Sequence, residues 1–87
     1  MYKLVYMAGW DKNFEKMDKH TQKQIWKKIQ KQANETKTRH LKYGLSFFVA
    51  ESGQNRIVLK IKDNEQTKEI WFAGSHKQYD EWRKALK

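Results

Sequence analysis

The sequence predicts an α+β fold in which a small, mostly antiparallel sheet carries helices packed on one face. Residues 56–63 (RIVLKIKD) alternate apolar and polar side chains, as a half-buried strand does. Ile25 and Ile29 recur at helical spacing in a long segment free of glycine and proline. The expected order of elements is β-α-α-β-β-β-α. At 87 residues, the chain is predicted to form a single domain over residues 1–87.

The first elements are predicted to be a strand and a short helix. Residues 2–7 (YKLVYM) alternate and are rich in β-forming residues. Gly9 interrupts this strand, and Asp11 is a suitable N-cap for a short helix. That helix is expected to turn two apolar residues inward, Phe14 and Met17.

A longer helix is predicted over residues 19–34. Asp18 is suited to cap its N-terminus. The lysines of this segment occupy the other faces, where they are expected to be solvated. The inward residues at helical spacing are Ile25, Trp26, Ile29 and Ala33.

A hairpin is predicted after an irregular connector. Residues 36–44 (TKTRHLKYG) show no period and are taken as the connector. Residues 45–52 (LSFFVAES) and 56–63 form the two strands, joined by a turn at residues 53–55. In the second strand Ile57, Leu59 and Ile61 face one side, and the residues facing the other side are Arg56, Val58, Lys60 and Lys62.

The chain is predicted to close with a strand and a helix. A turn at residues 63–66 (DNEQ) leads into a fourth strand over residues 67–73 (TKEIWFA). The final helix is expected in residues 75–87 (SHKQYDEWRKALK). Tyr79, Trp82 and Leu86 fall on one stripe of this helix.

The composition points to an anionic partner. Nineteen Lys and Arg residues against ten Asp and Glu residues give a net charge of +9 and a pI near 9.8. Such a field favours nucleic acid, ribosomes, an acidic protein or an anionic membrane, while a merely soluble lysine-rich surface is the alternative. MYKLVYMAG is too short and too alternating for a signal peptide, and no segment reaches transmembrane length. We expect a cytoplasmic protein.

No metal site and no cofactor are predicted. The chain has no cysteine, which excludes disulfides and cysteine-ligated zinc. His20, His40 and His76 lie on separate elements without ligand spacing. RNA cleavage needs neither, because the 2′-hydroxyl lies beside the phosphorus and positioning, charge and proton transfer suffice.

Three positions have both a functional and a structural interpretation. Arg56, with Lys60 and Lys62 in a row, suits phosphates, although charged strand faces also serve solubility. His76 follows a Gly-Ser corner at a helix start, where it could donate a proton to a leaving 5′-oxygen. Alternatively, Ser75 caps the helix and His76 merely occupies its first turn. Trp82 has the spacing of a core residue, or it stacks on a base.

The order of elements resembles the RelE/ParE toxin superfamily over nearly all 87 residues. Four segments carry the resemblance: YKLVYMAGWDKNFEKM, RHLKYG, SGQNRIVLKI and IWFAGSHKQYDEW. The RelE branch implies a type II toxin–antitoxin toxin that inhibits translation. Its activity would be that of an endoribonuclease that cuts mRNA in the ribosomal A site by 2′-hydroxyl attack, without metal. A cognate acidic antitoxin and ribosome-bound mRNA are the implied partners.

The resemblance implies roles for individual residues. Arg56 falls on the family's phosphate-binding arginine, and His76 falls where members carry an arginine or histidine as general acid or charge stabiliser. Trp82 falls where RelE-like members have a tyrosine. These three are the predicted catalytic residues. The predicted RNA-binding residues are Arg39, His40, Lys42, Lys60 and Lys62.

The chain also departs from the family. RelE-type members often have lysines where this chain has Phe47, Phe48 and Val49, so the general base stays open. The candidates are Arg39, His40, Lys42 and Glu51. Two alternative functions also stay open: a ParE-like, non-enzymatic inhibitor of DNA gyrase, and a catalytically degenerate RNA-binding module.

Overall fold

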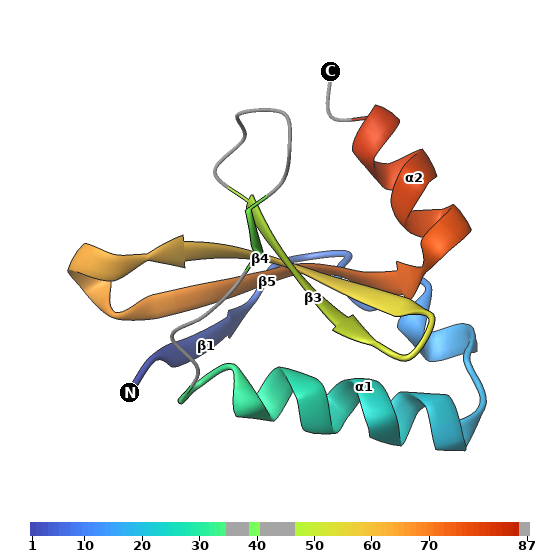
Figure 1. Ribbon diagram of the computed structural model, residues 1–87, viewed down its shortest axis with the longest axis horizontal. Helices are drawn as coiled ribbons and strands as arrows, with labels where there is room; N and C mark the ends of the chain where they lie inside the picture. The colour runs from blue at the N-terminus through green and yellow to red at the C-terminus, as the bar shows by residue number, and fades with distance from the viewer. Residues whose placement is uncertain (35–38, 41–46, 86–87) are drawn as a thin grey trace.

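A computed structural model describes residues 1–34, 39–40 and 47–85. This part of the chain forms one five-stranded sheet with the strand order β1-β5-β4-β3-β2 (Figure 1). β1 is parallel to β5, and the other neighbours are antiparallel. None of its helices is long and apolar enough to cross a membrane. The elements are β1 (Lys3–Tyr6), η1 (Phe14–Lys16), α1 (Lys19–Lys31), β2 (Arg39–His40), β3 (Phe47–Ser52), β4 (Asn55–Lys62), η2 (Asp63–Glu65), β5 (Thr67–Ser75) and α2 (His76–Lys84), where η denotes a 3₁₀ turn.

The predicted α+β class is confirmed, but the helices lie on opposite faces of the sheet. Ile57 packs in one cluster with Ile25 and Ile29 of α1, whereas the next residue, Val58, packs in another with Tyr79 of α2. Successive strand side chains point to opposite faces, and Figure 1 shows α1 and α2 on opposite sides. The expectation of helices on one face was wrong because the face opposite α1 has its own apolar residues, Val49, Val58 and Phe72 on three neighbouring strands, and these also need a cover.

The two clusters divide the core between them. The first lies under α1 and contains Ile25, Ile29, Ala50, Ile57, Leu59, Ile70 and Ala73, with Leu4, Trp10, Phe14 and Met17 packed against it. The second lies under α2 and is rich in aromatic rings. Its members are Val49, Val58, Phe72 and Tyr79, with Phe47, Trp71 and Trp82 packed against them. Burying aromatic rings in this way stabilises a small domain with little interior.

Several predicted details of the first half differ from the structure. Asp11 caps no helix, because the predicted short helix is the single turn η1, preceded by Asn13 without a side-chain cap. α1 ends at Lys31, three residues early. Trp26 was expected inward but is 44% exposed, because Ile25 and Ile29 already fill the narrow stripe that faces the sheet. Ala33, beyond the helix, accepts a hydrogen bond from Tyr2 N–H at 2.7 Å.

The connector contains a short strand that the irregular sequence did not reveal. Arg39 and His40 form β2 and pair with Val49 and Phe48 of β3. Two residues are too few to show a period, so only the pairing identifies this strand. The rest of the predicted connector, 36–38 and 41–44, lies outside the described residues, as do the predicted strand residues 45–46 and the predicted stripe residue Leu86.

The last hairpin holds an irregularity that matters for the site. The register of β4 and β5 shifts between Val58, which pairs with Phe72, and Leu59, which pairs with Ile70. Trp71 is therefore an extra residue on β5, as in a β-bulge. Trp71 and Phe72 consequently both pack in the second cluster. Strict alternation would have put one of them on the α1 side.

Asp18 is confirmed as the N-cap of α1, and it makes acid stability testable. Its Oδ1 accepts the Thr21 N–H at 2.8 Å, and hydrogen bonds from the Thr21 side chain and backbone lower the pKa of Asp18. This stabilisation is complete above the ordinary aspartate pKa of about 3.9 and is lost as the pH falls through the lowered value. Asn at position 18 keeps a cap but does not titrate. We therefore expect the melting temperature of Asp18→Asn to fall less between about pH 5 and pH 2 than that of wild type. Parallel melting curves across that range would contradict the assignment.

Candidate active site

The sheet face that carries α2, here called the front face, presents the polar side chains of β4. Arg56, Lys60 and Lys62 point to this same face, as predicted. Residues two positions apart on a strand are separated by about 6.6 Å, so Arg56 lies about twice that distance from Lys60. The Arg56 guanidinium carbon is 4.9 Å from the centre of the Tyr79 ring, and Lys60 Nζ is 6.0 Å from the centre of the Phe47 ring. Cations held over aromatic rings keep defined positions while retaining their charge. β4 therefore presents two cations, Arg56 and Lys60, beside aromatic rings.

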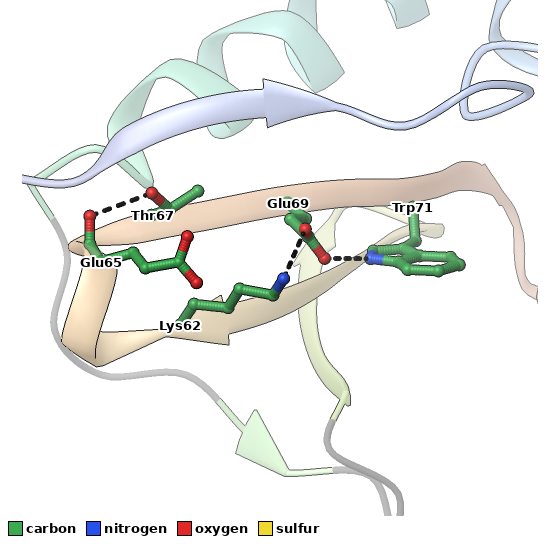
Figure 2. A network of polar contacts seen from close by, with 5 residues as sticks. All are labelled: Lys62, Glu65, Thr67, Glu69 and Trp71. Atoms are coloured by element: carbon green, nitrogen blue, oxygen red, sulfur yellow. Dashed lines mark hydrogen bonds and ion pairs between the residues drawn. The ribbon is translucent and has the colours of Figure 1, made fainter.

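A carboxylate that the sequence analysis missed interrupts this row. Glu69 of β5 is paired with Lys60 in the register, and its Oε2 lies 3.3 Å from Lys62 Nζ. Its Oε1 accepts the Trp71 indole N–H at 3.0 Å, so the network of Figure 2 links the two strands. Lys62 is thus engaged in an ion pair, and the cationic character of the row rests on Arg56 and Lys60. Only the strand register could have revealed this contact.

The register also brings a second carboxylate to Arg56. Glu51 of β3 lies directly opposite Arg56, and on the other side Arg56 is opposite Gly74 of β5. The Cβ atoms of opposed residues lie about 5 Å apart on the same face of the sheet. Among the four candidates for the general base, Glu51 is therefore the one that the described strands place beside Arg56.

α2 begins where β5 ends, and its first turn is tightly fixed. Ser75 Oγ accepts the Gln78 N–H at 3.2 Å, and Gln78 Oε1 accepts the Ser75 N–H at 2.9 Å, which completes a capping box. The interpretation that Ser75 caps the helix is therefore confirmed. His76 occupies the first turn with its side chain 61% exposed.

Asp80 orients the exposed histidine. His76 Nε2 lies 3.5 Å from Asp80 Oδ2, and Arg83 Nη2 lies 3.7 Å from Asp80 Oδ1. The sequence analysis overlooked Asp80, although its i+4 spacing from His76 in a predicted helix was a usable signal. A histidine held at one nitrogen by a carboxylate presents its ring in a defined direction.

Gly74 lets α2 approach the sheet beside Arg56. A Cβ at this position would lie 2.5 Å from Cζ of the buried Phe72 and 2.9 Å from Gln78 Oε1. We expect Gly74→Ala to lower the free energy of unfolding by about 1–3 kcal/mol, because the packed ring must shift and the capping box loses its acceptor. Urea unfolding followed by circular dichroism measures the loss. Gly53→Ala, where a Cβ meets nothing within 4 Å but φ is +61°, serves as a backbone-strain comparison.

Trp82 lies within the second cluster. Its ring is stacked on Phe72 with centroids 5.4 Å apart and meets Phe47 edge-on at 5.6 Å. It also lies 6.5 Å from the Tyr79 ring. These contacts span β3, β5 and α2, so the ring joins the helix to the sheet. Because Trp82 is only partly buried, part of it also faces solvent.

Two of the remaining predicted RNA-binding residues lie at one edge of the sheet. Arg39 and His40 are on β2, which is separated from β4 by β3. Lys42 lies outside the described residues. No group of three or more metal-ligating side chains occurs in the described ranges. The described site therefore consists of a guanidinium with a carboxylate opposite, next to a helix that presents an imidazole.

Comparison with known proteins gives matches among solved structures alone. No family model matches the sequence, and no curated protein does. The isolated RelE toxin of Escherichia coli aligns over 100% of both chains with a TM-score of 0.72 and 17% identity. The matching chain of the E. coli RelBE toxin–antitoxin complex aligns with a TM-score of 0.73 and 16% identity, over 86% of this chain and 96% of that one. A metal-bound toxin from Helicobacter pylori aligns with a TM-score of 0.72 and 24% identity, over 90% of this chain and 98% of that one. This chain therefore has the fold of the RelE toxins.

Proposed function

We propose that this chain is the toxin of a type II toxin–antitoxin pair and inhibits translation as a ribosome-dependent mRNA endoribonuclease. The observation that carries the proposal is the register of the sheet, which places Glu51 opposite Arg56 beside the start of α2. The RelE fold and the net charge of +9 support it.

The proposed cleavage uses three side chains. Glu51 removes the proton from a ribose 2′-hydroxyl, whose oxygen then attacks the adjacent phosphorus. Arg56 stabilises the negative charge that develops on the phosphorus-bound oxygens. The bond between phosphorus and the 5′-oxygen breaks, and His76 donates a proton to that oxygen. The products are a 2′,3′-cyclic phosphate and a 5′-hydroxyl end. Asp80 orients His76 and does not touch the substrate.

Other predicted residues are assigned to RNA binding. Lys60 extends the cationic surface along β4. Lys62 can contact the RNA backbone when its ion pair with Glu69 is replaced by one with a phosphate. Arg39 and His40 are proposed to contact RNA from the edge strand β2, and Lys42 remains a predicted RNA-binding residue. Trp82 packs α2 against the sheet and offers the rest of its ring to a base.

The proposed partners follow from charge. A cytoplasmic toxin of this charge would be neutralised by an antitoxin with an acidic segment that folds on contact. Expression of the chain alone should then arrest growth, and co-expression with the antitoxin should relieve the arrest.

Primer extension on a defined mRNA engaged by translating ribosomes tests the proposed function. New 3′ ends within A-site codons, seen only when the protein is present, would support it. Intact mRNA would shift the assignment to a gyrase inhibitor, an alternative favoured by the apolar residues Phe47 and Val49 on β3, and a supercoiling assay would follow. RNA binding on ribosomes with neither effect would indicate a degenerate module.

The assignment of Glu51 has its own test. We expect Glu51→Gln to slow mRNA cleavage on ribosomes by about 100-fold or more, since the amide cannot accept the proton from the 2′-hydroxyl. Glu65→Gln is the matched control, because Glu65 is exposed at the far turn of the β4–β5 hairpin. Equal rates for wild type and Glu51→Gln would remove Glu51 from the mechanism.

A further inference from the structure

Two aromatic rings remain exposed on the side of the molecule away from the front face. Besides Met1, Tyr6 and Trp26 are the large hydrophobic residues that stay exposed in the described part of the chain, at 38% and 44%. Their rings are stacked with centroids 5.9 Å apart and planes inclined by only 16°. We call this pair the rear platform. An exposed aromatic pair costs solubility, so its position calls for an explanation.

The rear platform is held in place by its neighbours. Gln30 Nε2 donates a hydrogen bond to the Tyr6 hydroxyl at 3.1 Å, and the Trp10 ring lies 5.2 Å from the Tyr6 ring. Trp10 in turn lies 5.1 Å from Phe14, and both pack against the first core cluster. The exposed rings are thus the outer end of an aromatic chain anchored in the core. A surface of this kind is ordered before it meets a partner, which lowers the entropy cost of binding.

Lysines lie on the same helix face as Trp26. α1 contains five lysines and no acidic residue. Lys19 and Lys23 precede Trp26 by seven and three residues, so they lie within about 60° of it around the helix. Both are exposed. A flat ring with lysines along the same helix face matches a chain of stacked bases joined by phosphates.

The residues around Trp26 disfavour a protein helix as the partner. An amphipathic helix docks along apolar side chains repeated at i, i+3, i+4 and i+7. On α1 the neighbours of Trp26 at these spacings on its exposed side are Gln22, Lys23 and Gln30. The described surface therefore offers one stacked pair of rings with lysines beside it, without the apolar ridge that such a helix needs.

We infer that the rear platform is a second RNA-binding surface, which stacks an unpaired base on Trp26 while Lys19 and Lys23 hold its phosphates. The surface lies on the α1 side of the sheet, opposite the face that carries α2 (Figure 1). A single strand bound there is thus distinct from one bound at Arg56. The inference goes beyond the proposed function and does not depend on cleavage.

Fluorescence anisotropy with a labelled oligoadenylate of about ten nucleotides tests the inference, in wild type and in an Arg56→Ala background that weakens the front face. Trp26→Leu should weaken binding roughly tenfold in both backgrounds, whereas Trp26→Phe should keep most of the affinity. Lys23→Gln should weaken binding and reduce the salt slope by about 0.7. Lys31→Gln is the control, since Lys31 is exposed on the same helix about 140° from Trp26.

Three results would overturn the inference. The first is equal affinity of wild type and Trp26→Leu for the oligonucleotide, with circular dichroism showing both folded. The second is a Trp26→Leu variant that loses as much affinity for an RNA duplex as for the single strand, because the base faces of a duplex are not available for stacking. The third is Trp26-dependent binding of polyglutamate without Trp26-dependent binding of RNA, which would identify an acidic protein surface as the partner. A variant that loses mRNA cleavage but binds the oligonucleotide as wild type does would test the proposed active site and would not test the rear platform.

Discussion

Replacing Arg56 with alanine is expected to reduce mRNA cleavage on ribosomes by about 100-fold or more and to abolish growth arrest. The guanidinium is the cation that the register places directly opposite Glu51, at the strand end next to α2. Its removal would leave the developing charge on the phosphate without a fixed partner. Primer extension with purified protein and translating ribosomes measures the cleavage, and a growth curve on induction measures the toxicity.

Two companion variants test whether the loss is specific to the site. Lys84→Ala is the control for the loss of one positive charge, because Lys84 is exposed on the last turn of α2. It should retain cleavage. His76→Ala should reproduce the loss seen with Arg56→Ala while keeping the melting temperature. Full activity in both Arg56→Ala and His76→Ala would place the site elsewhere.

Trp82→Ala is expected to lower the free energy of unfolding by about 3 kcal/mol. The ring contacts Phe47, Phe72 and Tyr79, and its deletion opens a void where α2 meets the sheet. Urea unfolding monitored by circular dichroism measures the change. For a domain of this size, whose total stability is about 5–15 kcal/mol, such a loss is a large fraction.

Trp82→Phe distinguishes packing from base stacking. Phenylalanine keeps an aromatic ring in the cluster and should restore much of the stability, with a residual loss of about 1 kcal/mol from the smaller ring. If Trp82 acts only by packing, cleavage should recover along with stability. A stable Trp82→Phe protein with strongly reduced cleavage would show that the indole itself contacts RNA. A Trp82→Ala protein as stable as wild type would contradict the packing role.

The proposed catalysis and the stability of the fold are therefore linked at α2. The capping box at Ser75, the close approach at Gly74 and the Trp82 contacts all fix the same helix end. That end carries His76. A variant that loosens α2 would move the imidazole relative to Arg56, so every loss of activity in this region should be compared with the melting temperature of the same protein.

Local signals in the sequence predicted most elements correctly. Asp18 and Ser75 cap the two helices because a side-chain oxygen can reach a backbone N–H three residues on, a relation contained within one turn. The alternation of β4 is a relation between next neighbours, and it correctly predicted that Ile57 and Leu59 share one face of the sheet. The same local rules failed at β2, where two residues are too short to carry a period.

The sequence by itself determined the order of the elements other than β2, the caps at Asp18 and Ser75, the α+β class and the facing of Arg56 with Lys60. Only the tertiary structure decided that the helices cover opposite faces, that Glu51 lies across from Arg56, that Glu69 engages Lys62, and that Trp26 remains exposed beside Tyr6. The physical reason is the range of the interactions. Periodicity and capping depend on residues within about four positions of one another, whereas register, bulges and the packing of distant segments depend on which surfaces compete for the same core.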